Sequence, residues 1–263
     1  MKYLLNSLNK KIIKGSTKTK GTNFSGKICV RHRGGGGPKQ YRLIDWNRRL
    51  NQFGRILHTS YDPNRNATLG FILFQNGFLA WHILTEQIVA GHRIFAGDPR
   101  LKNLNFNLSI QHFYGYTLPL EYFPLFSVVS NVEGKLKSGS KLARSAGAQM
   151  VLVAQESGKS TLKSKSGWLL TVSNQCLATS GSVSNSSYKN VPWVKAGKSR
   201  GMGRRPVVRG VAMNPCDHPH GGGEGKKGSP RRTKTPWGKL TKGPHTKNTK
   251  KDKIKRRLFL KIR

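Results

Sequence analysis

The sequence predicts an all-β protein in which two small barrels lie between basic, irregular ends. Through the middle of the chain, short runs rich in β-branched and aromatic residues alternate with Gly, Asn and Asp-Pro turns. Many short strands at this spacing are typical of small antiparallel barrels. The two ends lack the apolar periodicity that would bury a core, and they carry most of the positive charge.

The first set of strands is expected between residues 26 and 97. Their sequences are GKICVRH, KQYRLIDW, GRILHTSY, ATLGFILF, GFLAWHIL and HRIFAG. The most apolar stretch, FILFQNGFLAWHIL, is interrupted by Gln75, Asn76 and Gly77, whereas a bilayer helix needs roughly 18 apolar residues. An Asn-Gly turn between two apolar runs is the strongest short hairpin signal, so this stretch predicts two paired strands and no membrane span.

The second set of strands is expected from FSVVSNV, QMVLVAQE, STLKSKS and GWLLTVSN. Between the two sets, residues 101–125 show no clear period, and we place a boundary near residue 120. KLARSAGAQ, which begins at Lys141, predicts a helical turn. The predicted segments are a basic arm at 1–25, a first barrel domain at 26–120, a second at 121–194 and a basic extension at 195–263.

The charge of the chain points to a polyanionic partner. The 263 residues include 48 Lys and Arg against 10 Asp and Glu, a formal net charge of +38. Such a charge opposes compaction unless a polyanion neutralises it, which favours nucleic acid over an anionic membrane surface. Residues 1–55 carry 14 Lys and Arg against one acid and residues 195–263 carry 22 against three, whereas residues 56–194 carry 12 against six. Nucleic-acid contacts are therefore expected mainly at the two ends.

The cysteines and histidines predict neither a disulfide framework nor a metal site. Cys29, Cys176 and Cys216 are an odd number without a close pair, which indicates a reducing compartment. In MNPCDHPHGGGEG, Cys216 lies near His218 and His220, but Cys-x-His-x-His does not provide the two paired arms of a zinc site. We expect no cofactor, apart from magnesium ions held through a bound RNA.

Two glycine-rich segments interleaved with cations are the main candidates for nucleic-acid contact. They are RHRGGGGPKQYR, from Arg31, and HPHGGGEGKKG, from His218. Neither GGGEGKKGS nor GMGRRP has the spelling of a nucleotide-binding loop. Backbone amides without side chains let a phosphate backbone approach closely, and neighbouring Lys and Arg neutralise it. The alternative interpretation is a flexible linker or a loose loop with solvated charges.

Asp217 and His218 raise the alternative of an acid–base centre in a nucleic-acid-processing enzyme. Side chains on adjacent residues usually diverge, and a glycine-rich tail supplies no pocket. We therefore expect a non-enzymatic protein in which His218 is a structural contact, while Asp217 and Pro219 fix the turn. A generic nucleic-acid-compacting protein is the third alternative, although it would show repeated Lys-rich blocks instead of two different folded segments.

Five motifs, in the same order, resemble the universal large-subunit ribosomal protein L-two family. They are RHRGGGGPKQYR, SYDPNRNATLGFI, KLARSAGAQMVLVA, KAGKSRGMGRRPVVRG, and GVAMNPCDHPHGGGEGKKG followed by TPWGKLTKG. The likeness covers residues 26–80 and 127–245 and is weak across 81–125. It implies an oligonucleotide-binding-fold barrel, then an SH3-like barrel, then an extension that enters ribosomal RNA.

The resemblance also implies a function. The expected protein is a structural constituent of the large ribosomal subunit that binds its RNA near the peptidyl-transferase centre and supports assembly, subunit association and translation. The implied partners are large-subunit ribosomal RNA, neighbouring ribosomal proteins, the small subunit and nearby tRNA, with no small-molecule substrate. An Asn-, Lys-, Ile- and Phe-rich sequence is typical of an AT-biased organellar genome, so we expect a mitochondrial ribosome, with a bacterial or plastid ribosome as the alternative.

The residues expected to bind RNA are cations, ring side chains and the glycines between them. The histidine most discussed in the family corresponds to His218. The full set is Arg31, His32, Arg33, Lys39, Arg42, Arg144, Lys198, Arg200, Arg204, Arg205, Arg209, His218, His220, Gly221, Gly222, Gly223, Lys226, Lys227, Arg231, Arg232, Trp237, Lys239 and Lys242.

Overall fold

The computed structural model describes residues 12–16, 20–102, 113–224, 232–242 and 259–261. The chain falls into two compact units. The first, called the sheet unit here, comprises Met1–Thr17, Pro38–Pro192 and Ile254–Arg263, and the second, called the basic unit, comprises Lys18–Gly37 and Trp193–Lys253. The segment RHRGGGG, which we expected at the start of the first barrel, thus clusters with the C-terminal extension.

The sheet unit is built from short strands with 3₁₀ turns at Pro99–Lys102, Leu120–Tyr122 and Ser186–Asn190. In chain order the described strands are β1 (Ile13–Ser16), β2 (Lys39–Arg42), β3 (Gln52–Ser60), β4 (Leu69–Phe74), β5 (Leu79–Ile83), β6 (Arg93–Ala96), β7 (Thr117–Pro119), β8 (Val128–Ser130), β9 (Val132–Glu133), β10 (Ser140–Leu142), β11 (Met150–Glu156), β12 (Lys159–Ser164), β13 (Trp168–Ser173), β14 (Leu177–Ser180) and β15 (Phe259–Lys261). This content confirms the all-β prediction.

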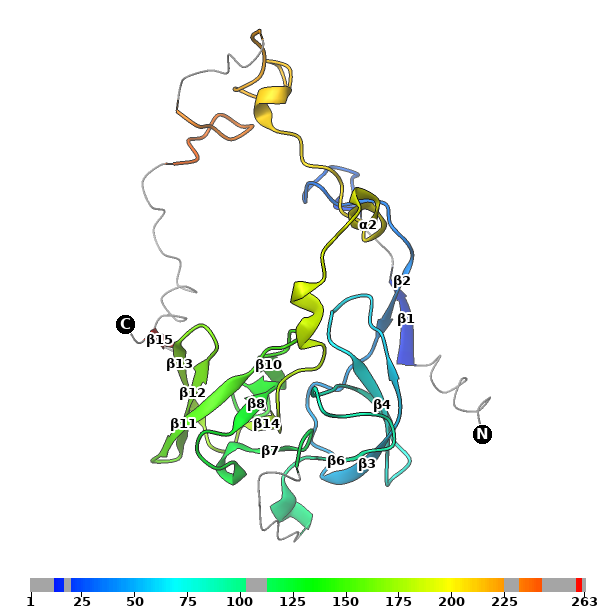
Figure 1. The fold of residues 1–263 in the computed structure, drawn as a ribbon, viewed down its shortest axis with the longest axis vertical. Coiled ribbons are helices and arrows are strands. Elements are labelled where there is room, and N and C mark those ends of the chain that lie inside the picture. The colour runs from blue at the N-terminus through cyan, green and yellow to red at the C-terminus, as the bar shows by residue number, and fades with distance from the viewer. Residues whose placement is uncertain (1–11, 17–19, 103–112, 225–231, 243–258, 262–263) are drawn as a thin grey trace. The chain divides into compact units, whose positions relative to one another are not determined.

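Eleven of these strands form one sheet in the order β15-β13-β12-β11-β8-β14-β7-β6-β3-β4-β5 (Figure 1). Neighbours are antiparallel except β6 and β7, whose one parallel pair, Ala96 with Thr117, joins the two halves. The sheet is not closed, which differs from the two separate barrels that we expected. The reason is that β7 pairs with β14 on one side and with β6 on the other, so the hydrogen-bonded ladder continues from one half into the next.

The hairpin between β4 and β5 is confirmed. The backbone N–H of Phe74 donates to the carbonyl of Phe78 at 2.9 Å, so the turn holds three residues, Gln75 to Gly77. Gly77 has a φ of 81°, a left-handed conformation that glycine adopts without steric cost. The side-chain oxygen of Asn76 accepts from the N–H of Phe78 at 3.0 Å. The Asn-Gly pair therefore closes this turn as the sequence predicts.

Two other local predictions were wrong. GKICVRH, residues 26–32, forms turns instead of a strand, and the N–H groups of Cys29 and Val30 both donate to the carbonyl of Gly21. Its apolar side chains are exposed, so no core stabilises an extended strand there. KLARSAGAQ, expected to make a helical turn, instead ends β10 and continues through a turn in which the N–H of Gly147 donates to Val183.

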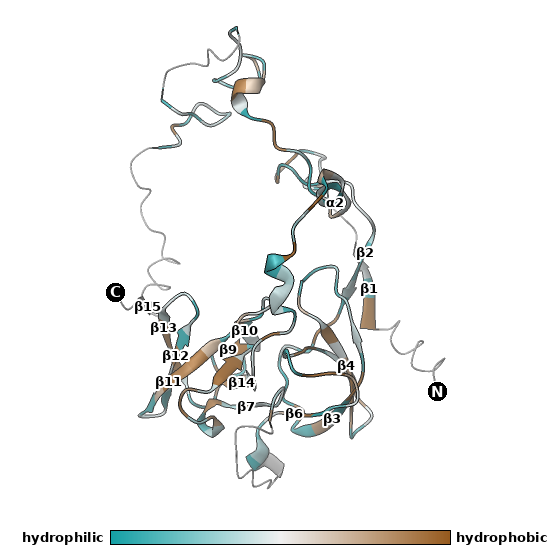
Figure 2. Cartoon of the chain, viewed as in Figure 1, coloured by the Kyte–Doolittle hydropathy of each residue, from teal (hydrophilic) through white to brown (hydrophobic). Residues whose placement is uncertain are grey.

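The core of the sheet unit consists of apolar side chains that its strands and connecting segments bury, and apolar residues concentrate in this unit (Figure 2). In the first half, Phe71 and the fully buried Trp81 pack with ring centroids 4.8 Å apart. In the second half, Leu152 and Leu162 face one another as paired residues of β11 and β12. Burying each such side chain stabilises the fold by about 1.5–3 kcal/mol, so this unit contains most of the folding energy of the described chain.

Buried polar contacts tie the halves of the sheet together. The guanidinium of Arg48, which is fully buried, donates to the hydroxyl of Thr179 at 2.6 Å and to the carbonyl of Ile83 at 3.1 Å. Burial lowers the pKa of Arg48 to about 10, and the nearby carboxylate of Asp45 opposes that shift, so the side chain stays charged at neutral pH. A buried charge without such partners would be strongly destabilising.

Glu133, also fully buried, provides a second connection. Its carboxylate accepts from Arg49 at 2.6 Å, from the N–H of Leu177 at 3.1 Å and from the N–H of Gly139 at 3.2 Å. These donors come from three separate parts of the chain. The carboxylate therefore fixes β9 relative to β14 and to the β2–β3 connection.

The basic unit has little regular structure and many backbone hydrogen bonds. It contains the short helix α2 (Ala196–Gly201), a 3₁₀ turn at Gly210–Ala212 and a bridge between Lys234 and Leu240. The sequence predicts an extension that is either disordered, or extended and ordered by a polyanion. Its described parts form turns that are closed by backbone hydrogen bonds.

Membrane insertion by a helix finds no support in the described residues, none of whose helices combines the required length with the required apolarity. The three cysteines are free. Cys176 is buried in the second half of the sheet unit, whereas Cys29 and Cys216 are exposed in the basic unit.

Candidate nucleic-acid interface

The two glycine-rich segments that the sequence singled out separately come together in the basic unit. Arg33 and Arg204 form an antiparallel bridge. Next to it, the N–H of Gly34 donates to the carbonyl of Gly203 at 3.0 Å, and the N–H of Arg205 donates to the carbonyl of His32, also at 3.0 Å. The backbones of RHRGGGG and GMGRRP are therefore paired side by side, and the basic residues of both segments lie close together.

Gly36 shows why glycine is needed where these segments meet. Its φ is 78°, and a β-carbon at this position would lie 2.5 Å from the carbonyl oxygen of Gly201. Both observations favour glycine. The positive φ is a left-handed backbone conformation that other residues rarely adopt, and the 2.5 Å contact leaves no space for a β-carbon between the two segments. The glycines here are structural requirements of the contact, which goes beyond the flexible linker considered from composition.

A groove of about 670 Å³ lies along this contact, lined by residues of both segments. Its cationic side chains are Lys20, Arg31, Arg33, Arg200 and Arg205, and no described acidic residue lines it. Five cations without a local counter-ion make a strongly positive trough, in which a nucleic-acid phosphate backbone would release counterions on binding. Sequence reasoning missed Lys20, because nothing in its neighbourhood indicates that the chain turns back towards Arg31.

Two tryptophans pair with cations of the same unit. The guanidinium of Arg31 lies 4.7 Å from the ring centroid of Trp237, and that of Arg204 lies 4.7 Å from the ring centroid of Trp193. Trp237 is 70% exposed, so its ring also presents surface to solvent. Cation–π contacts of this kind position the arginines, and exposed rings beside cations are suited to stacking on unpaired bases.

His218 is buried inside its own turn, with only 7% of its surface exposed. Its Nδ1 accepts a hydrogen bond from the backbone N–H of His220 at 3.0 Å. The ring also covers Gly210, where a β-carbon would lie 2.6 Å from ring atoms. Two residues later, Nε2 of His220 accepts a hydrogen bond from the backbone N–H of Lys234 at 2.9 Å. Both imidazoles thus use one ring nitrogen as a structural acceptor.

The turn itself is closed by backbone hydrogen bonds. The N–H groups of Asp217 and His218 donate to the carbonyl of Asn214, and the N–H of Gly221 donates to the carbonyl of His218. A β-carbon on Gly221 would overlap the backbone of Asn214. The carboxylate of Asp217 is exposed and accepts no hydrogen bond from a described residue, so Asp217 joins the turn through its amide. Pro219 is exposed at the tip.

This geometry also bears on the catalytic and metal alternatives. The partner of Nδ1 in His218 is a backbone N–H, where a general base would need an orienting carboxylate. One ring nitrogen each of His218 and His220 is engaged with a backbone N–H donor. Across the described residues no group of three or more His, Cys, Asp or Glu side chains is arranged to hold a metal ion.

Three of the expected RNA-binding residues, Lys39, Arg42 and Arg144, lie in the sheet unit. The guanidinium of Arg42 lies 5.5 Å from the ring centroid of Trp81 and donates to the hydroxyl of Ser60 at 3.1 Å. That of Arg144 lies 4.5 Å from the ring centroid of Trp46. Lys39 begins β2.

Arg65 also contacts Trp46, at 5.2 Å, and donates to the buried carboxylate of Asp62 at 2.7 Å. No sequence motif groups Trp46, Arg65 and Arg144, because they are far apart along the chain. The Trp46 ring thus meets two cations, whereas Trp81, Trp193 and Trp237 each meet one in the contacts described above.

The remaining expected residues are distributed along the extension. Lys198 and Arg200 lie on α2, Arg209 is exposed before the 3₁₀ turn, and Gly222 and Gly223 adopt φ values of 82° and 90°. Arg232, Lys239 and Lys242 are exposed in the hairpin-like turn around Trp237. Lys226, Lys227 and Arg231 lie outside the described residues.

Two protein-family models match the chain and together cover most of it. Residues 9–96 match Ribosomal Proteins L2, RNA binding N-terminal domain. Residues 114–238 match Ribosomal Proteins L2, C-terminal domain. The interval between the matches falls within the segment where the sequence motifs are weak.

Individual relatives are similar over nearly the whole chain. The large ribosomal subunit protein uL2 of Orientia tsutsugamushi (strain Ikeda) is 42% identical over 255 residues, which cover 97% of this chain and 89% of the relative. The uL2 proteins of Agrobacterium fabrum and Rhodospirillum rubrum are 40% and 41% identical, and each alignment covers 92% of this chain and 84% of the relative.

Proposed function

The chain belongs to the family of ribosomal proteins L2, and from this premise we propose that it binds large-subunit ribosomal RNA as a structural constituent of the large ribosomal subunit. The observation that carries the proposal is the groove of the basic unit. Five cations line it without a described acid. Phosphate contacts of this kind position a protein on folded RNA.

We propose that the protein acts without catalysis. The support is the setting of His218, whose ring is buried in a turn and whose Nδ1 accepts from the backbone. An imidazole held in this way orders the loop, and its Nε2–H is left to donate to a phosphate or ribose oxygen. General base catalysis needs a ring nitrogen that is free to accept a proton, whereas here Nδ1 already accepts from the backbone and Nε2 carries the hydrogen.

We further propose that the protein lies near the peptidyl-transferase centre and contributes to assembly, subunit association and placement of tRNA. The support is the resemblance of the C-terminal motifs to those of the family. On the same basis we assign an oligonucleotide-binding-fold domain to residues 26–120 and an SH3-like domain to residues 121–194. The basic segments 1–25 and 195–263 are assigned to RNA contact.

The particle that we propose is a mitochondrial ribosome of bacterial type, with a bacterial or plastid ribosome as the second candidate. The Asn-, Lys-, Ile- and Phe-rich composition favours an organellar gene. The relatives named above are bacterial, which supports the bacterial type of the ribosome.

Fractionation of native cells tests these proposals together. The protein should sediment with a large ribonucleoprotein particle, and ribonuclease or high salt should release it, since phosphate contacts weaken as salt rises. Recovery in purified mitochondria would support the organellar assignment, and recovery in the cytosolic or plastid ribosomes would replace it. Sedimentation as a free protein in every fraction would contradict the ribosomal role.

A further inference from the structure

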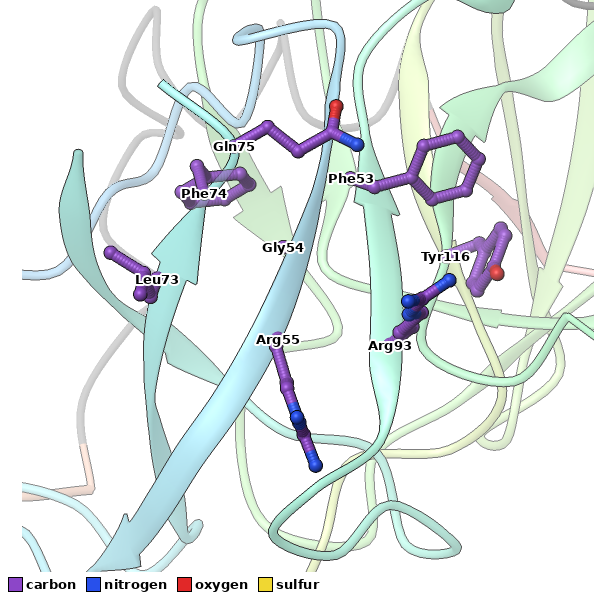
Figure 3. A pocket seen from close by; sticks show the side chains of 8 residues that line it. All are labelled: Phe53, Gly54, Arg55, Leu73, Phe74, Gln75, Arg93 and Tyr116. Atoms are coloured by element: carbon purple, nitrogen blue, oxygen red, sulfur yellow. The ribbon is translucent and has the colours of Figure 1, made fainter. Parts of the chain in front are cut away.

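A pocket on the sheet unit shares no lining residue with the glycine-rich segments and contains cations that no motif singled out. It has a volume of about 620 Å³ and is formed by β3, β4, β6 and Tyr116 (Figure 3). Its two cations are Arg55 on β3 and Arg93 on β6. Neither residue belongs to the RNA-binding set expected from the sequence.

Arg55 and Arg93 are directly opposite one another in the antiparallel pairing of β3 and β6. Side chains in such positions have β-carbons about 4.5–5.5 Å apart, and like charges there are destabilising. Both arginines are exposed, and neither forms an ion pair or a side-chain hydrogen bond with another described residue. Within the described sheet unit, this pair thus lacks the anion that would offset its repulsion.

The rest of the pocket is mainly apolar and aromatic. Phe53 and Tyr116 line one side, with ring centroids 6.3 Å apart in an edge-on arrangement. Burial raises the pKa of Tyr116, and the positive charge of Arg93 opposes that rise, which indicates that the guanidinium lies close to the phenol. Figure 3 shows Arg93 beside Tyr116 and Arg55 on the neighbouring strand.

The floor of the pocket is Gly54. A β-carbon there would lie 2.6 Å from the side chain of Ile72 and 3.0 Å from the ring of Phe74, so a larger residue would not fit without a shift. Side chains alternate across β3, so those of Phe53 and Arg55 lie on the other face from the core contacts of Gly54. A ligand that enters the pocket therefore meets apolar and aromatic side chains beside the two arginines.

We propose that Arg55 and Arg93 clamp a backbone phosphate of ribosomal RNA, with the attached nucleoside directed towards the aromatic side of the pocket. The inference rests on the proposed function, because it assumes RNA as the partner. Two guanidinium groups present several N–H donors in a fork that matches phosphate oxygens. The phosphate would neutralise a pair of charges that the strand register places unfavourably in the free protein.

An acidic peptide would satisfy the same two charges, but the backbone disfavours it. β3 is hydrogen-bonded on both sides, to β4 and to β6. β3, which carries Arg55, therefore has no open edge at this point to which a peptide could add as a strand, the usual way an extended peptide binds to a sheet. Aromatic and apolar lining beside paired cations is suited to a nucleotide.

The test uses the full chain and a transcript of large-subunit ribosomal RNA. Arg55→Gln combined with Arg93→Gln is compared with Lys159→Gln combined with Lys163→Gln, which removes two exposed cations from β12. The dissociation constant is measured across a series of salt concentrations. The arginine variant should lose about 0.7–0.9 from the slope of log affinity against log salt, the amount expected for one phosphate, and the lysine variant should lose less.

Thermal melting of the free protein provides an independent readout. Because the arginine pair is repulsive without RNA, Arg93→Gln should raise the melting temperature by about 1–4 °C while it weakens RNA binding. A fall in melting temperature would contradict the premise that the pair is unfavourable in the free protein. An RNA slope unchanged in the arginine variant, or lowered equally in the lysine variant, would overturn the clamp.

Two further results separate this inference from its premise. If the wild-type chain fails to bind the transcript, the proposed function itself fails. If the wild-type chain binds RNA, and the arginine variant loses binding only to polyglutamate used as an acidic-peptide probe, the pocket recognises a protein and the RNA clamp is wrong.

Discussion

His218 and His82 are both buried histidines, and their surroundings differ in a way that gives each a distinct test. Nδ1 of His218 accepts from the N–H of His220, so its ring holds a turn of the basic unit. His82 lies inside the sheet unit, with Nε2 3.5 Å from a carboxylate oxygen of Asp45 but without a hydrogen-bond partner in the described residues. The first ring is part of a loop, and the second is part of a core.

Replacing His218 should show whether its acceptor or its basicity matters. In His218→Asn, the amide oxygen can accept from the N–H two residues later, as in an Asx turn, so RNA binding and assembly should be retained. His218→Ala leaves that N–H without a partner and should weaken docking by about 1–3 kcal/mol. Particle assembly and peptide-bond formation are measured separately for both variants. Assembled His218→Asn particles whose peptide-bond formation is slowed about 100-fold would indicate catalysis instead.

The stability of the sheet unit should depend on pH through His82. Burial lowers the pKa of His82 to about 4 from its usual 6.5, an effect that the positive Arg48 increases and Asp45 opposes. The unfolded chain therefore takes up a proton first as the pH falls, and the folded state loses up to about 1.4 kcal/mol per pH unit between about pH 6.5 and pH 4. At neutral pH the imidazole is uncharged. The Asp45 carboxylate then accepts hydrogen bonds from the backbone N–H groups of Asn47 and Arg48.

Melting of the wild-type chain and of His82→Leu at pH 7 and pH 5 measures this dependence. His82 packs beside Phe74, with ring centroids 5.6 Å apart, so leucine keeps much of the apolar contact while removing the titrating group. The variant should lose less stability than the wild type between these two pH values. Equal losses would show that other groups control the acid sensitivity.

At the scale of elements, the crossing of two chain segments at Gly36 determines whether the basic unit forms. A β-carbon on Gly36 would meet the carbonyl of Gly201 at 2.5 Å, whereas one on Gly35 would meet no described atom within 4 Å. Both residues have positive φ, so alanine at either position costs about 1 kcal/mol of backbone strain. Only Gly36→Ala should separate the segments.

Limited proteolysis distinguishes the two alanine variants. Gly36→Ala should be cleaved faster than the wild type in residues 18–37 and should bind RNA less tightly, while Gly35→Ala should behave nearly as the wild type does. Both variants should keep the melting transition of the sheet unit. Identical cleavage of the two variants would contradict the structural role assigned to Gly36.

The buried carboxylate of Glu133 makes a separate prediction for the sheet unit. Glu133→Ala removes the acceptor for Arg49 and for the N–H groups of Gly139 and Leu177. Breaking a buried pair in this way should lower the free energy of unfolding by about 3–5 kcal/mol, measured by urea denaturation. A loss below about 1 kcal/mol, typical of an exposed ion pair, would mean that water replaces these contacts.

For the whole molecule, the features predicted from the sequence are those that depend on neighbouring residues. The hairpin at Asn76-Gly77 and the alternation of β11, β12 and β13 follow from local turn chemistry and side-chain period. The contact between RHRGGGG and GMGRRP could not be predicted in this way, because it joins segments about 170 residues apart. Local sequence patterns do not indicate which distant segments will meet. The pairing of Arg55 with Arg93 depends on strand register and was likewise hidden.

The distribution of charge along the sequence predicts that the two ends bind nucleic acid, but it does not predict how those ends fold. It placed RNA contact in the basic segments, and the groove contains five cations drawn from both of them. It gave no sign that residues 18–37 and 193–253 belong to one compact unit. The residues of GKICVRH suit β-structure and so predict a strand, yet Ile28 and Val30 remain exposed in the structure, without a core to stabilise one.

The most direct test of the central claim, that the groove of the basic unit binds ribosomal RNA, is the salt dependence of binding by charge-matched variants of the full chain. One variant changes four groove arginines to glutamine, and the control changes four exposed lysines of the sheet unit. The groove residues are Arg31, Arg33, Arg200 and Arg205, and the control residues are Lys135, Lys137, Lys159 and Lys163. The slope of log affinity against log salt should fall by about 3 in the groove variant, at roughly 0.7–0.9 per phosphate contact, and by much less in the control. Equal slopes in the two variants would contradict the claim, because net charge alone would then account for binding.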